Sequence, residues 1–364
     1  MQIKHITDYL ESIAPLNFQE SYDNAGLIVG ERTMPLKGVL LCLDSTEAVV
    51  DEAIAYGCNL IIAHHPIVFG GLKKINGNSY VERVVIKALK NDIAIYAIHT
   101  NLDNVSNGVN AKIAEKLGLI NTHILQPKGF LLKKLVTFCP KEHAAHVRTA
   151  LFQAGAGKIG NYDECSYNIE GLGTFKANEN ATPFVGTTGE LHTEAETRIE
   201  VIIPEHQESE VLKALLAAHP YEEVAYDIYP LSNQWRNVGA GMIGELPEAI
   251  EAIDFLKEIK VKLNTQLIKY TDTLGKKVKR VAVCGGSGSF LLKDAIRQGA
   301  DIFITADYKY HQFFDADGRI IIADVGHYES EQFTAELLHE LLIKKFTTFA
   351  VRFSKVNTNP VKYL

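Results

Sequence analysis

The sequence predicts an α/β protein with a core in two halves of mostly parallel sheets, interrupted by an inserted α+β domain. Two observations predict this class. Apolar runs of strand length alternate with amphipathic helical runs in the first and last thirds, which is typical of parallel sheets covered by helices. The middle of the chain instead follows a strand–helix–strands, strand–helix–strand order, which is typical of ferredoxin-like sandwiches.

The first and last thirds contain the elements of the predicted core. In the first third we expect strands at 38–44, 59–66 and 93–100, and helices at 45–57, 79–92 and 107–119. Ser45 is the expected N-cap of the first of these helices. In the last third we expect strands at 279–286, 301–307 and 319–327, and helices at 289–300 and 330–346. Both thirds therefore alternate strands with helices, as an α/β core does.

The middle region contains the elements of the predicted insert. We expect strands at 134–140, 165–177, 198–204 and 223–231, with helices at 142–155 and 208–220. The core would then comprise 1–127 and 233–364, and the inserted ferredoxin-like domain 128–232. Insertions are tolerated at exposed loops whose two ends lie close together, so this organisation is physically simple.

Composition excludes several classes of protein. The net charge of −7 makes nucleic acid an unlikely partner, because such proteins usually carry a basic surplus. The five cysteines are scattered and form no C-x-x-C pair, which fits a reducing compartment. No apolar run reaches membrane-spanning length, and the N-terminus has no apolar signal-peptide core. We therefore expect a soluble, cytoplasmic protein without a membrane partner.

Three expected strands end in residues that commonly bind metals. One strand ends in His64 and His65, the next in a run that reaches Asp103, and a third in His327, with Glu331 four residues later. Sites in open α/β sheets form at the carboxyl ends of strands, so these residues are expected to meet in one crevice. His327 and Glu331 would share one face of the helix that starts there.

This mixed set of imidazoles and carboxylates predicts a site for two divalent metals, of which Zn, Fe, Mn or Co suit the ligands. Glu331 or Asp103 could bridge them, and the pair would activate a water molecule. A single strand-end histidine is more often merely hydrogen-bonded, but several such ends together favour a metal site. His99 is either a further ligand or a hydrogen-bonded neighbour of the ligands, and Asp324 either such a neighbour or structural.

Other candidates are weaker. The backbone amides around Ser287 and Gly288 could bind an anion such as a phosphate, although a tight structural turn is an equal alternative. Asp307, Lys309 and His311 follow another strand end and could supply acid–base or substrate-binding groups. The pair His143 and His146 resembles a metal pair, but a solvated helix face explains it better.

Five sequence blocks, in this order, resemble one known family. They are SYDNAGL (21–27), IIAHHP (61–66), HTNLDN (99–104), GGSG (285–288) and GHYESE (326–331). The chain is similar throughout to the GTP cyclohydrolase 1 type 2 homologue family, also called NIF-three-like. Its HPYEE run (219–223) matches the CutA- and PII-like insert of the long bacterial members. Two positions depart from the family: Tyr22 stands where Trp is usual, and Tyr310 where His is frequent.

The resemblance implies a dinuclear metal centre held by His64, His65, Asp103, His327 and Glu331, with Glu331 as the bridging ligand. It also implies a toroidal homohexamer with the insert as a cap. We therefore expect a hydrolase with two divalent metal ions (Zn, Fe or Mn) that acts on a nucleotide-like or phosphate-bearing small molecule. Asp307 or His311 would transfer protons beside Glu331, while Ser287, Gly288 and Lys309 would bind substrate. The alternative is a non-enzymatic hexameric metal-binding scaffold or regulatory protein.

Overall fold

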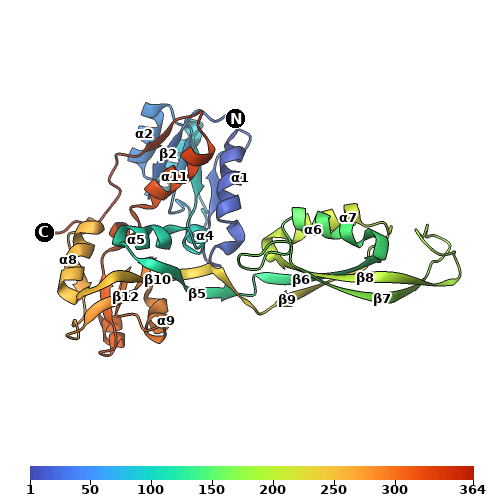
Figure 1. Cartoon of the computed structure of the whole chain (residues 1–364). Helices are drawn as coiled ribbons and strands as arrows, with labels where there is room; N and C mark the ends of the chain where they lie inside the picture. Colours follow the sequence, from blue (N-terminus) through green and yellow to red (C-terminus); the bar gives the residue numbers. More distant parts are fainter. The chain divides into compact units, whose positions relative to one another are not determined.

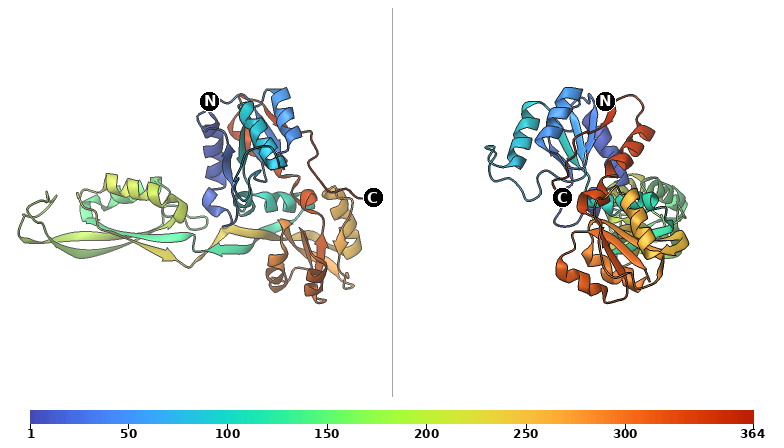
Figure 2. Two further views of the ribbon diagram at one scale, coloured as in Figure 1. Left: turned by 180° about the vertical axis from the view of Figure 1, so that it is seen from behind. Right: turned by 90° about the vertical axis from the view of Figure 1, so that its left-hand side faces the viewer.

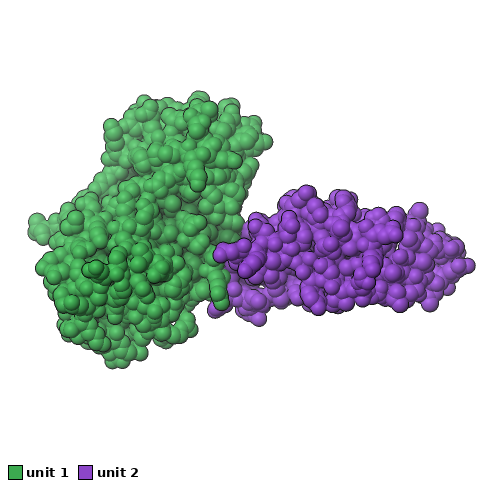
Figure 3. Space-filling model, in the orientation of Figure 1, with its two compact units in different colours: residues 1–127, 236–364 green, residues 128–235 purple.

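The computed structural model describes all residues from Met1 to Leu364. The chain separates into two compact units, shown in different colours in Figure 3. Unit 1 comprises Met1–Pro127 and Arg236–Leu364, and unit 2 comprises Lys128–Trp235. The mixed α/β class expected from the sequence is confirmed, and the chain forms several sheets.

The first sheet of unit 1 has the strand order β1-β4-β3-β2-β15. Its strands are β1 (Gly26–Val29), β2 (Val39–Cys42), β3 (Leu60–Ala63), β4 (Ala94–Ala97) and β15 (Val351–Phe353). All neighbouring pairs are parallel except β1 with β4. Every residue of β2, β3 and β4 is buried, which explains their continuous apolar sequences.

Helices cover this sheet and supply much of its core. The helices of this region are α1 (Ile3–Ile13), η1 (Leu16–Phe18), α2 (Glu47–Tyr56), α3 (Tyr80–Lys90), α4 (Thr100–Asp103) and α11 (Thr334–Lys345). Figure 1 labels β2 of this sheet, near α2 and α11. Helices α2 and α3 pack against β2, β3 and β4 through a shared apolar cluster. The expected N-cap of α2 is wrong by one residue, because the Thr46 hydroxyl, not that of Ser45, accepts from the Val49 amide.

The second sheet of unit 1 has the strand order β11-β14-β13-β12-β10-β5. Its strands are β5 (Ile120–Gly129), β10 (Gln234–Glu251), β11 (Lys269–Tyr270), β12 (Lys277–Ser287), β13 (Ile302–Ala306) and β14 (Ile321–Asp324). Only the central strands β12, β13 and β14 are parallel; β10 and β11 flank them in antiparallel pairing. The expected parallel sheet therefore describes the centre of this sheet and not its edges.

The helices of this half are α5 (Val109–Leu117), α8 (Ala252–Lys262), η4 (Ser289–Leu291), α9 (Leu292–Arg297), η5 (Tyr310–Ala316) and α10 (His327–Glu331). Figure 2 shows α8 and α9 beside the orange strands of this sheet. The strand expected to reach His327 ends at Asp324. Gly326 then adopts φ 97°, so the backbone leaves the extended conformation and His327 opens a short helix.

Unit 2 consists of one antiparallel sheet and two helices. The sheet has the order β7-β8-β6-β9, built from β6 (Leu132–Pro140), β7 (Ser166–Lys176), β8 (Leu191–Pro204) and β9 (Tyr226–Leu231). The helical segments are η2 (Lys141–His143), α6 (Ala144–Gln153), η3 (Glu205–Gln207) and α7 (Glu208–Ala218). Residues of α6 and α7 share an apolar cluster with β6 and β8, so both helices cover one face of the sheet. No helix of either unit is long and apolar enough to cross a membrane.

Candidate metal centre

The structure brings together the five side chains that the sequence marks as metal ligands, all within unit 1. The Nε2 atoms of His65 and His327 lie 3.0 and 3.1 Å from Oε2 of Glu331. Nε2 of His64 lies 3.8 Å from the other oxygen, Oε1, of Glu331 and 3.7 Å from Oδ1 of Asp103. Glu331 therefore stands at the centre, with histidines on both of its oxygens.

Both sheets of unit 1 contribute to this cluster. His64 and His65 directly follow β3, and Asp103 ends α4, the short helix that follows β4. His327 and Glu331 open and close α10, which follows β14. The carboxyl ends of parallel strands in two different sheets therefore meet here, as expected for sites of α/β proteins.

Each histidine of the site is oriented by a hydrogen bond at its Nδ1 atom. The acceptors are the Ile98 carbonyl for His64 (2.8 Å), Asp44 for His65 (2.7 Å), Asp23 for His99 (2.7 Å) and Asp307 for His327 (2.7 Å). A partner that accepts from Nδ1 fixes the ring and leaves the Nε2 lone pair free to bind a metal. His99 belongs to the group, because its ring centroid lies 5.3 Å from those of both His64 and His65.

The C-terminal segment contacts one of these orienting acceptors and one further residue of α10. The Thr358 hydroxyl donates to Oδ2 of Asp44 at 2.6 Å, and the other oxygen of Asp44 holds His65. The Asn359 amide donates to Glu329 at 3.0 Å, and Glu329 lies on α10 between His327 and Glu331. This segment therefore supports the Asp44 contact of His65 and is anchored to α10.

Two glycines allow the backbone of β12 to approach Glu331. A Cβ atom at Gly286, whose φ is +59°, would lie 2.5 Å from Oε1 of Glu331. A Cβ atom at Gly285 would lie 3.2 Å from Cγ of Glu331. Only a residue without a side chain fits at Gly286, both for its backbone conformation and for the space.

The charges of the cluster shift the pKa values of its members. Burial and the charge of Glu331 raise the pKa of Asp103. Burial opposes ionisation of Glu331, but hydrogen bonds with the surrounding histidines outweigh it and hold its pKa well below the usual range. Burial also disfavours protonation of His65 and His327, but their carboxylate partners outweigh it and raise the two pKa values to about 9 and about 11. Positive charge is therefore strongly favoured around Glu331.

Two buried polar atoms at the centre of the cluster have no hydrogen-bond partner. They are Nε2 of His64 and Oδ1 of Asp103. A buried polar atom without a partner is costly, and a cation between these two atoms would satisfy both. The donor set of imidazole nitrogens and carboxylate oxygens suits Zn, Fe or Mn. The residues present therefore fit a divalent metal, and the groups His64–His65–His99 and His65–His327–Glu331 each could hold an ion.

A cavity of about 440 Å³ opens onto the cluster. Besides the ligands, its walls include Tyr22, Phe69, Phe290 and Ser287. The rings of Tyr22 and Phe69 lie 6.1 Å apart, and both are exposed. The cavity therefore combines histidine and carboxylate side chains with exposed aromatic rings.

The remaining predicted residues lie in less central positions. Asp307 orients His327, whereas Lys309 and His311 are exposed on or beside η5 and do not line the cavity. The Gly288 amide donates to Thr305, which favours the structural-turn alternative for this loop. Asp324 accepts from the amides of Tyr308 and Gly326 and pairs with Lys269, so it shapes the turn before His327.

Sequence reasoning missed Asp23 and Asp44, which hold His99 and His65. Asp44 was recognisable, because it is the last residue of the expected strand 38–44, and His64 and His65 likewise lie at the carboxyl end of the expected strand 59–66. Asp23 lies in an irregular segment, where no periodicity indicates its direction. Its carboxylate also accepts from the hydroxyl of Thr100.

Fold and site together define an α/β protein with a cluster of histidines and carboxylates able to hold a metal ion. Comparison with known proteins identifies the family. The chain belongs to the Duf34/NIF3 (NGG1p interacting factor 3) family, which matches residues 1–360.

Full-length relatives agree with this assignment. The chain is 40% identical to a GTP cyclohydrolase 1 type 2 homolog from Halalkalibacterium halodurans, covering 99% of this chain and 98% of that protein. It is 39% identical to the protein of the same name from Bacillus subtilis, over 99% of this chain and 98% of that one. A solved Bacillus cereus protein related to NIF3 is 40% identical, with a TM-score of 0.87 and coverage of 100% and 99%.

Proposed function

We propose that this chain is a dinuclear metal-dependent hydrolase, similar to GTP cyclohydrolase 1 type 2, that acts on a nucleotide-like or phosphate-bearing small molecule. The carrying observation is Glu331, whose two oxygens face different histidines: Oε2 faces His65 and His327, and Oε1 faces His64. A carboxylate in this position can bridge two ions. Two divalent ions (Zn, Fe or Mn) would activate water and stabilise charge that develops during hydrolysis.

The residues of the chain have separable tasks in this proposal. Oε1 of Glu331, His64 and Asp103 would hold one ion, and Oε2 of Glu331, His65 and His327 the other. His99 would complete or support the first position. Asp307 keeps Nδ1 of His327 occupied, so it acts as a positioning residue for that ligand.

Substrate would enter through the 440 Å³ cavity. The exposed rings of Tyr22 and Phe69 at its mouth could stack on a planar heterocycle, which supports a nucleotide-like substrate. The side chain of Ser287, which also lines the cavity, is a candidate hydrogen-bonding group. Lys309 would bind substrate, and His311 would transfer protons, only if the surroundings of η5 change in an assembly.

The proposal extends to the insert, the assembly and the compartment. Residues 128–232 would form a CutA- or PII-like ferredoxin-like domain, supported by the antiparallel order β7-β8-β6-β9 with two helices on one face. The assembly would be a toroidal homohexamer. All cysteines are free, which supports a reducing compartment such as the cytoplasm.

The test combines metal content with turnover. Full-length protein loaded with Zn, Mn or Fe should contain two ions per chain by elemental analysis and should consume GTP or a related nucleotide. Glu331→Ala should lose both properties, whereas Glu248→Ala, at an exposed position of β10, should keep them. Undiminished turnover in Glu331→Ala would overturn the proposal.

The alternative is a non-enzymatic, hexameric metal-binding scaffold or regulatory protein. A separate core in unit 2, independent of the metal cluster, favours a binding or assembly task for part of the chain. Metal removal distinguishes the two functions. An enzyme would lose turnover and keep its oligomeric state in sedimentation, whereas a scaffold would dissociate.

A further inference from the structure

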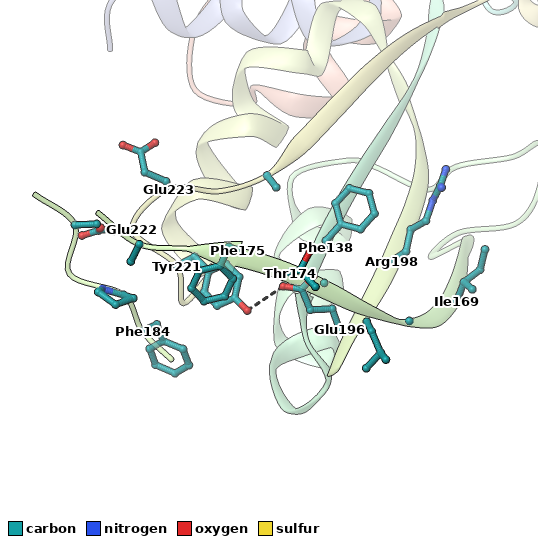
Figure 4. A pocket seen from close by; sticks show the side chains of 17 residues that line it. Phe138, Ile169, Thr174, Phe175, Phe184, Glu196, Arg198, Tyr221, Glu222 and Glu223 are labelled. Atoms are coloured by element: carbon teal, nitrogen blue, oxygen red, sulfur yellow. Dashed lines mark hydrogen bonds between the residues drawn. The ribbon is translucent and has the colours of Figure 1, made fainter. Parts of the chain in front are cut away.

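Unit 2 contains a second cavity, of about 570 Å³, that the proposed function does not use (Figure 4). Strands β6, β7 and β8 form part of its wall, and the segments that follow β7 and α7 form the rest. Its chemically informative residues are Phe138, Phe175, Phe184, Glu196, Arg198 and Tyr221. The volume is in the range of small-molecule sites.

The polar wall of this cavity lies on the sheet face opposite α6 and α7. Ile199 and Val201 of β8 pack into the cluster shared with both helices. Side chains alternate along a strand, so Glu196 and Arg198 point to the other face. Ile169 of β7 pairs with Arg198 of β8, so its side chain lies on the same face of the sheet. This face therefore remains free of the helices that cover the first.

Aromatic rings surround the carboxylate end of the cavity. The ring of Tyr221 lies 6.2 Å from that of Phe175 and 6.3 Å from that of Phe184. Phe184 also packs edge-on against His143 at 5.4 Å, although about half of its surface is exposed. These rings offer both faces and edges to a flat or apolar ligand.

Glu196 is placed among these rings by two features. The Tyr221 hydroxyl donates to Oε1 of Glu196 at 2.9 Å, drawn as a dashed line in Figure 4. Burial and the charge of Glu196 raise the pKa of Tyr221, so the phenol stays protonated and keeps donating. A Cβ atom at Gly173 would lie 2.1 Å from Oε2 of Glu196, so the glycine makes room for the carboxylate.

The charges of the cavity are predominantly negative. Glu222 and Glu223 line it together with Glu196. Arg198 is the cation of the wall, but it is paired with Glu200 at 2.8 Å. An anionic ligand would therefore meet excess negative charge, whereas a cation would meet an ion-pairing carboxylate beside aromatic rings.

We propose that unit 2 binds a small organic cation in this cavity, namely an amine with an aromatic or other flat apolar body. The ammonium group would pair with Glu196, and the body would pack between Phe175, Phe184 and Tyr221. A charge-assisted hydrogen bond and the attraction between a cation and aromatic faces both favour this class of ligand. The site is separate from the metal cluster and does not depend on the proposed hydrolase function.

The test uses the full-length chain and two probes of similar shape and opposite charge. Phenethylamine carries an ammonium group, and 3-phenylpropionate carries a carboxylate. Calorimetric titration at millimolar concentrations should give saturable binding of phenethylamine and none of 3-phenylpropionate. Glu196→Gln should weaken amine binding about tenfold, because it removes the ion pair and keeps the shape. Glu190→Gln, an exposed neighbour outside the cavity, should bind like the wild type.

A second variant keeps the test valid if Glu196→Gln fails to fold. Phe184→Ala removes an exposed ring from an irregular segment, so it should fold and bind phenethylamine several-fold more weakly. Equal amine binding by the wild type and both folded variants would overturn the proposal, as would tighter binding of 3-phenylpropionate. Self-association that shields the cavity and excludes phenethylamine would identify a second copy of the chain as its occupant, which also overturns it.

Discussion

The two cavities differ in how their polar groups are held. In the metal cluster of unit 1, Glu331 faces three histidines, and separate acceptors fix the far nitrogen of each ring. In the cavity of unit 2, Glu196 has one hydrogen bond, from Tyr221, and aromatic neighbours. The groups around Glu331 form a hydrogen-bonded network, so a substitution of one residue should affect the others. The contacts of Glu196 involve few neighbours, so a substitution there should affect only the cavity of unit 2. Effects of substitutions should therefore be large and shared in unit 1, and small and separable in unit 2.

Among substitutions outside the five predicted metal ligands, Gly286→Ala should have the largest effect. The added methyl group would meet Oε1 of Glu331 at 2.5 Å, and the φ of +59° disfavours any side chain. We expect metal affinity, measured by competition with a chelating dye, to fall about 100-fold. Gly299→Ala is the control, because its φ is +73° and no atom lies within 4 Å of the added carbon. It should cost about 1–2 kcal/mol of stability and leave metal affinity unchanged. Equal metal affinity in both variants would contradict this account of Gly286.

Metal removal should affect stability next most strongly. A ligand present at 100 times its dissociation constant stabilises the native state by about 2.7 kcal/mol. Urea unfolding of unit 1 should therefore shift by about this amount between Zn-loaded and chelator-treated protein, and Glu331→Ala should show no shift. Phenethylamine binding to unit 2 should be the same in both states. A loss of amine binding after metal removal would show that the two cavities are coupled.

Substitution of a residue that orients a predicted ligand should lower metal affinity less than substitution of a predicted ligand. Asp44→Asn removes the charge that holds Nδ1 of His65, so we expect metal affinity to fall about tenfold. Asp51→Asn is the matched control, because Asp51 is exposed and pairs only with Lys87 at the surface. If Asp44→Asn behaved like Asp51→Asn, His65 would not depend on its acidic neighbour.

The smallest effect is expected in unit 2. Tyr221→Phe removes the hydrogen bond to Glu196 and keeps the ring, which should cost about 1 kcal/mol, or about fivefold in phenethylamine affinity. Tyr229→Phe, at an exposed position of β9, should bind the amine normally. Metal content should be unchanged in both. A loss of metal from Tyr221→Phe would contradict the local character of this cavity.

The same contrast explains what the sequence could predict. His64, His65 and His327 stand shortly after the ends of apolar strands, and the geometry of parallel sheets brings such ends together. Glu331 follows His327 by four residues on the same helix. Their proximity could therefore be inferred before any coordinates were known. Glu196 and Tyr221 lie in an antiparallel sheet and in an irregular segment, where no rule of chain order indicates that they meet.

Elements with weak or mixed patterns were also missed. Strand β1 has only four residues, GLIV, and lies between irregular segments. The long strand β10 contains three glycines and several polar residues, so it lacks the continuous apolar run that marks β3. Their positions depend on pairing with β4 and β12, which are distant in sequence. The Thr46 cap illustrates the same limit at small scale, because Ser and Thr are both favourable N-caps and only the final geometry shows which of two adjacent residues caps the helix.

The separation of His65 and Glu331 by 266 residues has a consequence for biosynthesis. At 5–20 residues per second, a ribosome needs roughly 13 to 53 seconds to add the carboxylate after the histidine pair has been made. During that interval the nascent chain holds an incomplete set of ligands. In the proposed metal site, the complete set of ligands can therefore form only after α10 has been synthesised, so the order of translation would delay metal insertion until the last part of the chain is made.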